Sequence, residues 1–329
     1  MAKTREERLR GIVAIAVFLV ALGTARPGRA ETLTVAIGQK GIWNTNFLEL
    51  AESQGFFRDA GLTVQITYTQ GGANTLQPVI AGNVDLACAT GFLGAVSAYA
   101  KGAPIRLISA EATGNPAIYW YAKPEKGIRT IKDAADRTIA YSAPGSAGNL
   151  MILGLLAQEH VSAKLVQAGD QASTLTQVMT DQIDVGWAVA PTLLAEIDAG
   201  KLVMVARGTD VVSMRDETAS AHIVNLAALK TKRDALTRFL KVYARVIDWA
   251  YKDPRAVDHL AETMDVTRAA AQRAVDEFFP KAMFRFGEPI GVQKILDDAY
   301  ATRRIPEKMT ATRLAGMYDI LYSGPGQGK

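Results

Sequence analysis

Short apolar segments alternate with amphipathic ones over residues 33–85, and this alternation limits the possible folds more than any other feature. Residues 33–37 and 64–66 have the apolar, β-branched composition of strands. Stretches with helical spacing precede Gly55 and Gly82. A strand followed by a helix and then by another strand is typical of parallel sheets with helices on their faces. We therefore predict an α/β fold.

The same alternation continues along the first two thirds of the chain. We expect the second strand to extend over 63–68, and further strands at 84–88, 105–109, 117–122, 138–141, 164–167, 183–188, 202–206 and 221–226. The clearest helix is 235–251, where apolar residues recur every three or four positions. From Lys230 onward the pattern is almost entirely helical. No internal repeat is visible in the sequence.

Residues 1–30 have the features of a secretory signal peptide. Basic residues at the start precede an apolar run from Ile12 to Leu22, and Gly28 and Ala30 supply the small residues that a signal peptidase needs. The run is shorter than the roughly 20 residues that span a bilayer. We predict export to the periplasm with cleavage after Ala30; an uncleaved N-terminal anchor is the alternative.

The basic character of the whole chain comes from this segment. The chain has 37 Lys plus Arg against 33 Asp plus Glu; residues 1–30 hold six basic and two acidic residues, which leaves 31 against 31. A neutral mature protein lacks the basic surface that nucleic acid requires. The single cysteine, Cys88, excludes an intramolecular disulfide and a cysteine-based metal cluster, and its apolar neighbours predict a buried strand residue.

Motifs of catalysis or of cofactor binding are missing from the sequence. His160, His222 and His259 have no metal-binding spacing, and the residues around Ser146 do not form a nucleophile elbow. The glycine-rich end, 324–329, is similar to a phosphate loop, but no helix can follow it. We predict a protein that is not an enzyme and needs no metal or cofactor.

Several segments resemble a known family. Residues 39–41 (Gln–Lys–Gly), the Asn149–Leu150 step, the segment 184–191 and the segment 304–308 are similar to the substrate-binding proteins of ABC importers for sulfonates, taurine and nitrate. That family also includes binders of thiamine precursors, which often carry His after an Asn-x-Asn step. Here Phe47 follows that step, which favours a sulfonate, taurine or nitrate-like solute.

The resemblance implies the architecture and the partners. It predicts a two-lobed periplasmic binding protein of type II, in which each lobe is a mainly parallel sheet flanked by helices and a hinge joins the lobes. Lobe 1 would comprise residues 31–112 and 220–329, and lobe 2 residues 113–219. The protein would be a monomer that delivers a small solute to a membrane permease driven by an ATPase.

Ligand sites in open α/β sheets lie beyond the carboxyl ends of strands, where loops lead into helix N-termini with free N–H groups. Four turns of this chain occupy such places, and one further strand end faces them across the predicted cleft. The candidate residues are Lys40 and Trp43 in the first turn, Gly71 and Gly72 in the second, Thr90, Gly91 and Phe92 in the third, Ser142, Gly145 and Ser146 in the fourth, and Trp187 and Pro191 across the cleft.

The polar candidates are predicted to hold an anionic head group. Lys40 offers a point charge, the glycines allow close approach to the backbone, and the hydroxyl of Ser146 donates a hydrogen bond. The resemblance implies a similar role for Thr90, because the family commonly places a hydroxyl residue against the ligand at this turn. The aromatic candidates, Trp43, Phe92 and Trp187, would cover the organic part of the solute.

Each role has a structural alternative. Lys40 can be solvated, the two tryptophans can be core residues, and Ser146 can be a helix N-cap. Arg215, Glu217 and His222 rank below the four turns.

The predicted function is capture of a small organic anion for import. Three alternatives stay open at this point: a neutral pyrimidine or an aromatic carboxylate as solute, a sensing module without transport, and an enzyme. Stoichiometric binding without turnover would remove the last.

Overall fold

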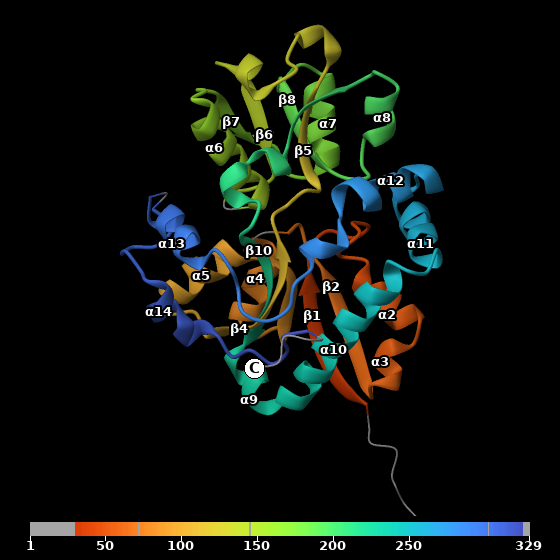
Figure 1. Cartoon of the computed structure of the whole chain (residues 1–329), viewed down its shortest axis with the longest axis vertical. Helices are drawn as coiled ribbons and strands as arrows, with labels where there is room; N and C mark the ends of the chain where they lie inside the picture. Colours follow the sequence, from red (N-terminus) through yellow and green to blue (C-terminus); the bar gives the residue numbers. More distant parts are fainter. Residues whose placement is uncertain (1–29, 72, 145, 302, 325–329) are drawn as a thin grey trace, which may run out of the picture.

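Two five-stranded sheets, each flanked by helices, form an upper and a lower lobe (Figure 1). The computed structural model describes residues 30–71, 73–144, 146–301 and 303–324. The predicted signal peptide lies outside these residues apart from Ala30. Within them, no helix is both long enough and apolar enough to cross a membrane.

The lower sheet is built from both ends of the chain. Its strands, in spatial order, are β2 (Leu62–Tyr68), β1 (Glu31–Ile37), β3 (Leu86–Gly91), β10 (Thr218–Asn225) and β4 (Ile105–Thr113). Strand β10 runs antiparallel to both of its neighbours, and the other four strands share one direction.

Helices of the lower lobe cover both faces of this sheet. They are α2 (Phe47–Ser53), α3 (Phe56–Asp59), α4 (Ala73–Ile80), α5 (Phe92–Ala100), α9 (Leu226–Thr231), α10 (Arg233–Ala250), α11 (Arg255–Met264), α12 (Arg268–Phe278), α13 (Val292–Ala301) and α14 (Ala311–Leu314). Helix α10 has ten buried residues, in agreement with the amphipathic pattern of its sequence.

The upper sheet repeats this strand order with new segments. Its strands, in spatial order, are β7 (Lys164–Gln167), β6 (Thr138–Tyr141), β8 (Val185–Val189), β5 (Ile118–Ala122) and β9 (Val203–Arg207), with β5 antiparallel to both neighbours. Its helices are α6 (Ala147–Glu159), α7 (Gln171–Met179) and α8 (Leu194–Asp198). The fold therefore contains a topological repeat that the sequence does not reveal, and the predicted two-lobed α/β class is confirmed.

The chain passes between the sheets twice, at two adjacent segments. The N–H of Gly114, in the first passage, donates to the carbonyl of Glu217 in the second at 3.0 Å. A Cβ atom on Gly208 would lie 2.1 Å from the carbonyl oxygen of Asn115, so only glycine allows this approach. The passages agree in place with the predicted hinge; the lobe boundaries at 112 and 219 stay a prediction.

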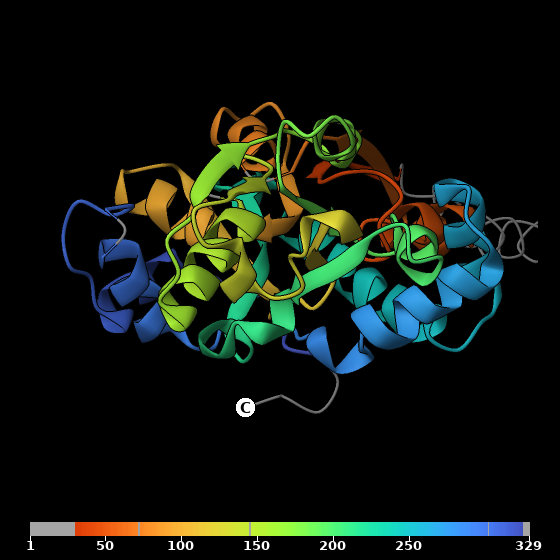
Figure 2. The same cartoon turned by 90° about the horizontal axis from the view of Figure 1, so that it is seen from above.

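Helix α12 also contacts the upper lobe, on the side away from α6 (Figures 1 and 2). Arg273 forms an ion pair with Asp198 of α8. The guanidinium of Arg207, at the end of β9, lies 4.0 Å from the centroid of the Phe278 ring and donates to the carbonyl of Glu277 at 2.9 Å. The lobes are thus joined at one edge by side chains as well as by the chain.

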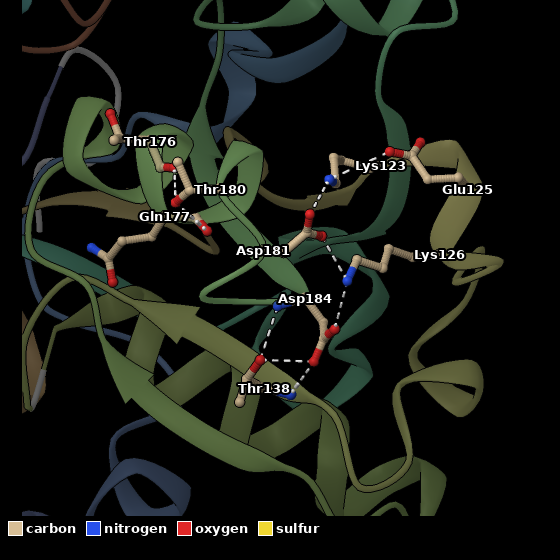
Figure 3. A network of polar contacts seen from close by, with 9 residues as sticks. All are labelled: Lys123, Glu125, Lys126, Thr138, Thr176, Gln177, Thr180, Asp181 and Asp184. Atoms are coloured by element: carbon tan, nitrogen blue, oxygen red, sulfur yellow. Dashed lines mark hydrogen bonds and ion pairs between the residues drawn. The ribbon is translucent and has the colours of Figure 1, made fainter.

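A reciprocal threonine–aspartate pair joins the two central parallel strands of each sheet. In the lower sheet, the N–H of Thr34 donates to Asp85 Oδ2 at 2.8 Å and the N–H of Asp85 donates to Thr34 Oγ1 at 2.9 Å. In the upper sheet the same bonds join Thr138 and Asp184, at 3.0 and 2.9 Å (Figure 3). A lysine reaches each aspartate: Lys232 lies 2.9 Å from Asp85, and Lys126 3.4 Å from Asp184.

A carboxyl group is buried in the lower lobe directly behind the end of β3. Glu111, with no exposed surface, accepts the N–H of Ala89 at 2.5 Å and the hydroxyl of Tyr243 at 2.7 Å. Burial raises the pKa of Glu111 to about 7, although these hydrogen bonds act in the opposite direction. Ala89 has a positive φ of 50°, so Glu111 supports a strained residue within β3, directly before the predicted ligand residues Thr90 and Gly91.

Thr138→Val should lower the free energy of unfolding by about 1–3 kcal/mol, because it leaves Asp184 without one donor and its N–H without an acceptor. Urea unfolding measures this loss. The matched control is Thr176→Val, at a position in the same lobe (Figure 3), because the exposed hydroxyl of Thr176 donates to the carbonyl of Ala172 in its own helix. Equal effects of the two substitutions would contradict the role of the Thr138–Asp184 pair.

Glu111→Gln should alter how stability depends on pH. The folded pKa of Glu111 is raised, so its contribution is complete below the unfolded pKa of about 4.5 and is lost as the pH rises to about 7. Relative to the variant, the wild type should therefore lose on the order of 3 kcal/mol between pH 5 and 8. Burial lowers the pKa of nearby His222 to about 3, so its protonation in the unfolded chain also changes stability below about pH 6.5, but both proteins share this contribution and it cancels in the difference. Urea unfolding at several pH values measures the difference; a constant difference would show that Glu111 does not titrate there.

Candidate functional site

A cavity of about 660 Å³ lies between the lobes. Helix α6 forms its upper wall through Leu150, Met151 and Gly154, and the start of α5 and one face of α13 form its lower wall. Gly91, in the third predicted turn, and Ala147, the first residue of α6, both border it. The cavity thus reaches the third turn that the sequence singles out and the residue that directly follows the fourth.

A second, more polar hollow of about 450 Å³ lies where the ends of β1 and β2 face the start of α7. Gln39 and Lys40 line it from below, and Asp170 and Gln171 from above. The amide of Gln171 donates to the side-chain oxygen of Gln39 at 3.2 Å and accepts the N–H of Val189 at 2.7 Å. This glutamine connects the lobes next to the hollow.

The N-terminus of α6 combines a helix cap with a cation from the other lobe. Ser146 is the N-cap, and its hydroxyl accepts the N–H of Asn149 at 3.2 Å. Arg304, in the segment after α13, donates to the side-chain oxygen of Asn149 at 3.2 Å. Burial lowers the pKa of Arg304, and no carboxylate lies within ion-pair distance among the residues that the structure describes. A helix N-terminus and a guanidinium without a counter-ion together favour an anion.

The structure places the third turn partly in the wall and partly in the core. Gly91 and Phe92 line the cavity, although Phe92 is otherwise buried. Thr90 is 1 % exposed, and its hydroxyl bonds to the carbonyl of Cys88 at 3.3 Å. The geometry favours a structural role for Thr90 over contact with a ligand.

The residues of the first turn do not have the surroundings that their predicted ligand-binding roles require. Lys40 lines the polar hollow, but its ammonium lies 2.8 Å from Glu49, so its charge is compensated. Trp43 has no exposed surface, and its indole donates to the hydroxyl of Tyr251 at 2.9 Å. Trp43 is therefore a core residue in this structure, which corrects its assignment as an aromatic wall of the site.

The remaining candidate residues differ in how exposed they are. Gly71 has a positive φ of 81° with open space around it, as close approach of a ligand requires. Gly72 and Gly145 lie outside the described residues, and Ser142 is half-buried in the fourth turn. Trp187 is 6 % exposed, and its indole nitrogen is buried without a hydrogen-bond partner in the described part of the chain; Pro191 follows a cis peptide bond at the end of β8.

The structure offers no arrangement for metal binding within its described ranges, since no three His, Cys, Asp or Glu side chains gather there as ligands. His222 is fully buried, with Nδ1 3.3 Å from the sulfur of Cys88. Burial lowers the pKa of His222 and raises that of the Cys88 thiol, so neither group is charged near neutral pH. These features describe a core contact.

Sequence reasoning missed Arg304, Gln171 and Glu111 as residues of or behind the site. Arg304 belongs to the segment 304–308 that resembles the family, and this was the available signal. Gln171 follows the N-cap Asp170 of α7, a helix start that follows β7 in the same way as the turns already chosen. Glu111 lies in a strand, and nothing in its neighbours predicts the partners that reach it.

Comparisons with known proteins bear on the family and the fold. The family model described as "NMT1/THI5 like" matches residues 44–257, more than half of the chain. No curated protein matches the sequence.

Solved structures share the architecture. The periplasmic aliphatic sulphonate binding protein SsuA from Escherichia coli has a TM-score of 0.69 at 18 % identity, over 91 % of this chain and 94 % of its own. The alkanesulfonate-binding protein SsuA from Xanthomonas axonopodis pv. citri, bound to MOPS, has a TM-score of 0.72 at 16 % identity, over 88 % and 98 %. The nitrate-binding protein NrtA from Synechocystis has a TM-score of 0.66 at 13 % identity, over 88 % and 85 %.

At identities this low, the solved structures show the fold of this chain and do not identify its ligand. The family is shown by the match of the sequence itself to the family model. The chain belongs to the NMT1/THI5-like family and has the periplasmic-binding-protein fold.

Proposed function

We propose that this protein is the solute-binding component of an ABC importer and captures a small organic anion between its lobes. One observation carries the proposal: the N-terminus of α6 and the guanidinium of Arg304, which has no carboxylate partner among the described residues, meet beside an interlobe cavity. Structural neighbours that bind aliphatic sulphonate or nitrate support an anionic solute.

The electrostatics favour Arg304 over Lys40 as the main cation for the head group. The ammonium of Lys40 already has Glu49 as a partner at 2.8 Å, so an anion there would compete with an existing ion pair. Arg304 is half-buried, which raises the cost of leaving its charge uncompensated. An anion that bonds to Arg304 and to the first N–H groups of α6 would compensate the charge of the guanidinium and supply acceptors for those N–H groups.

Such a solute would connect the lobes, because Arg304 comes from the lower lobe segment and α6 from the upper. Ligand contacts from both sides stabilise the closed arrangement of a two-lobed protein over the open one. The closed form would then present its joint surface to a membrane permease driven by an ATPase. Export to the periplasm through the predicted signal peptide and a monomeric state belong to the same proposal.

Arg304→Gln should weaken binding of an alkanesulfonate by about tenfold to a hundredfold, the value of a hydrogen bond to a charged group. Isothermal titration of the mature protein with ethanesulfonate measures the change. Arg303→Gln is the matched control, since Arg303 is the exposed neighbour and the substitution removes the same charge. Equal losses of affinity in both variants would mean that Arg304 acts only through its long-range charge and not through a contact with the head group.

Ser146→Gly separates the two roles of the Ser146 hydroxyl. Glycine is nearly as good an N-cap as serine, so stability should fall by only a few tenths of a kcal/mol. If the hydroxyl also donates to the anion, affinity should fall by about 1–2 kcal/mol. Thermal melting of the free protein and titration with ethanesulfonate give the two values. Unchanged affinity would leave Ser146 as a cap alone.

A further inference from the structure

The interlobe cavity has mainly apolar walls beyond the residues that border the proposed anion site. The upper wall is one face of α6, since Ala147, Leu150, Met151, Gly154 and Ala157 recur at helical spacing along it. These residues span ten positions, or about 15 Å of helix. The cavity therefore leads away from the helix N-terminus along the length of α6.

Helix α6 is apolar on more than one side. Ile152, Leu155 and Leu156 are buried in the upper lobe, yet Leu153 lines the cavity and is 39 % exposed. Val212, across the cavity in the second passage, is 59 % exposed. Large apolar side chains that face a common hollow mark a surface suited to an apolar ligand.

The polar groups at the cavity are mostly engaged with one another. Lys294 lies 3.1 Å from Glu217 and 2.6 Å from Asp298, so the charged side chains of the described lining are paired. The amide of Gln158 accepts the N–H of Val212 at 3.1 Å and donates to the carbonyl of Asp210 at 3.1 Å. The lysine of the described lining thus already has two carboxylate partners, so these residues hold no free cation that would receive a second anionic group of a solute.

We propose that this cavity binds the apolar body of an amphipathic organic anion, an alkyl or aryl chain with a single sulfonate or carboxylate head at the N-terminus of α6. The inference rests on the proposed function and narrows its solute class. A volume of about 660 Å³ suits a ligand of drug-like size and far exceeds what nitrate fills. Taurine fits poorly, because its ammonium, two carbons from the sulfonate, would lose its water against the apolar face of α6.

The test is a titration series of n-alkanesulfonates from methane- to octanesulfonate against the mature protein. Each added methylene that enters the cavity should tighten binding by about fourfold, until the space is filled. Taurine should bind more weakly than ethanesulfonate, its uncharged-tail counterpart. A flat series, or equal binding of taurine and ethanesulfonate, overturns the inference and leaves the anion-binding function intact.

Gly94→Leu tests the location. Gly94 lines the cavity from α5, and a Cβ there would meet no atom within 4 Å, so the new side chain occupies cavity space. The variant should bind methanesulfonate as the wild type does and lose the dependence on chain length. A chain-length dependence equal to that of the wild type would overturn the assignment of the tail to this cavity. Failure of every sulfonate and carboxylate to bind the wild type would overturn the proposed function itself.

Discussion

The reciprocal hydrogen bonds between threonine and aspartate determine the geometry on which both halves of the site depend. In each sheet they join the two strands at which the strand order reverses, β1 with β3 below and β6 with β8 above. The loops that leave these strands at their carboxyl ends diverge, which opens a crevice. Because the bonds lie near the opposite ends of the strands, they hold the spacing of the loops without occupying the crevice.

The two lobes contribute different chemistry to that crevice. The upper lobe supplies a helix N-terminus and an apolar helix face, and the lower lobe supplies Arg304 and the wall formed by α5 and α13. Neither lobe alone holds both a cation and a helix N-terminus at this place. The proposed anion would therefore contact both lobes, and its binding energy would become available for closure.

Strand positions could be predicted from the sequence because they depend on local composition, and Cys88 was correctly expected in a buried strand. The roles of single side chains could not. Trp43 is buried by Tyr251, more than 200 residues away, and the charge of Lys40 is compensated by Glu49 of the following helix. Arg304 reaches the site only because the chain returns to the lower lobe after building the upper one. Such contacts depend on tertiary packing, which local patterns do not contain.

The contacts of α12 with the upper lobe also restrict how the two lobes can move relative to each other. The ion pair of Arg273 with Asp198 and the stacking of Arg207 on Phe278 join the lobes at the edge away from α6. A rotation that preserves these contacts separates the lobes on the opposite side, where α6 faces α13 (Figure 2). The axis of such a rotation would lie along α12, and the proposed solute would then enter from the side, parallel to α6.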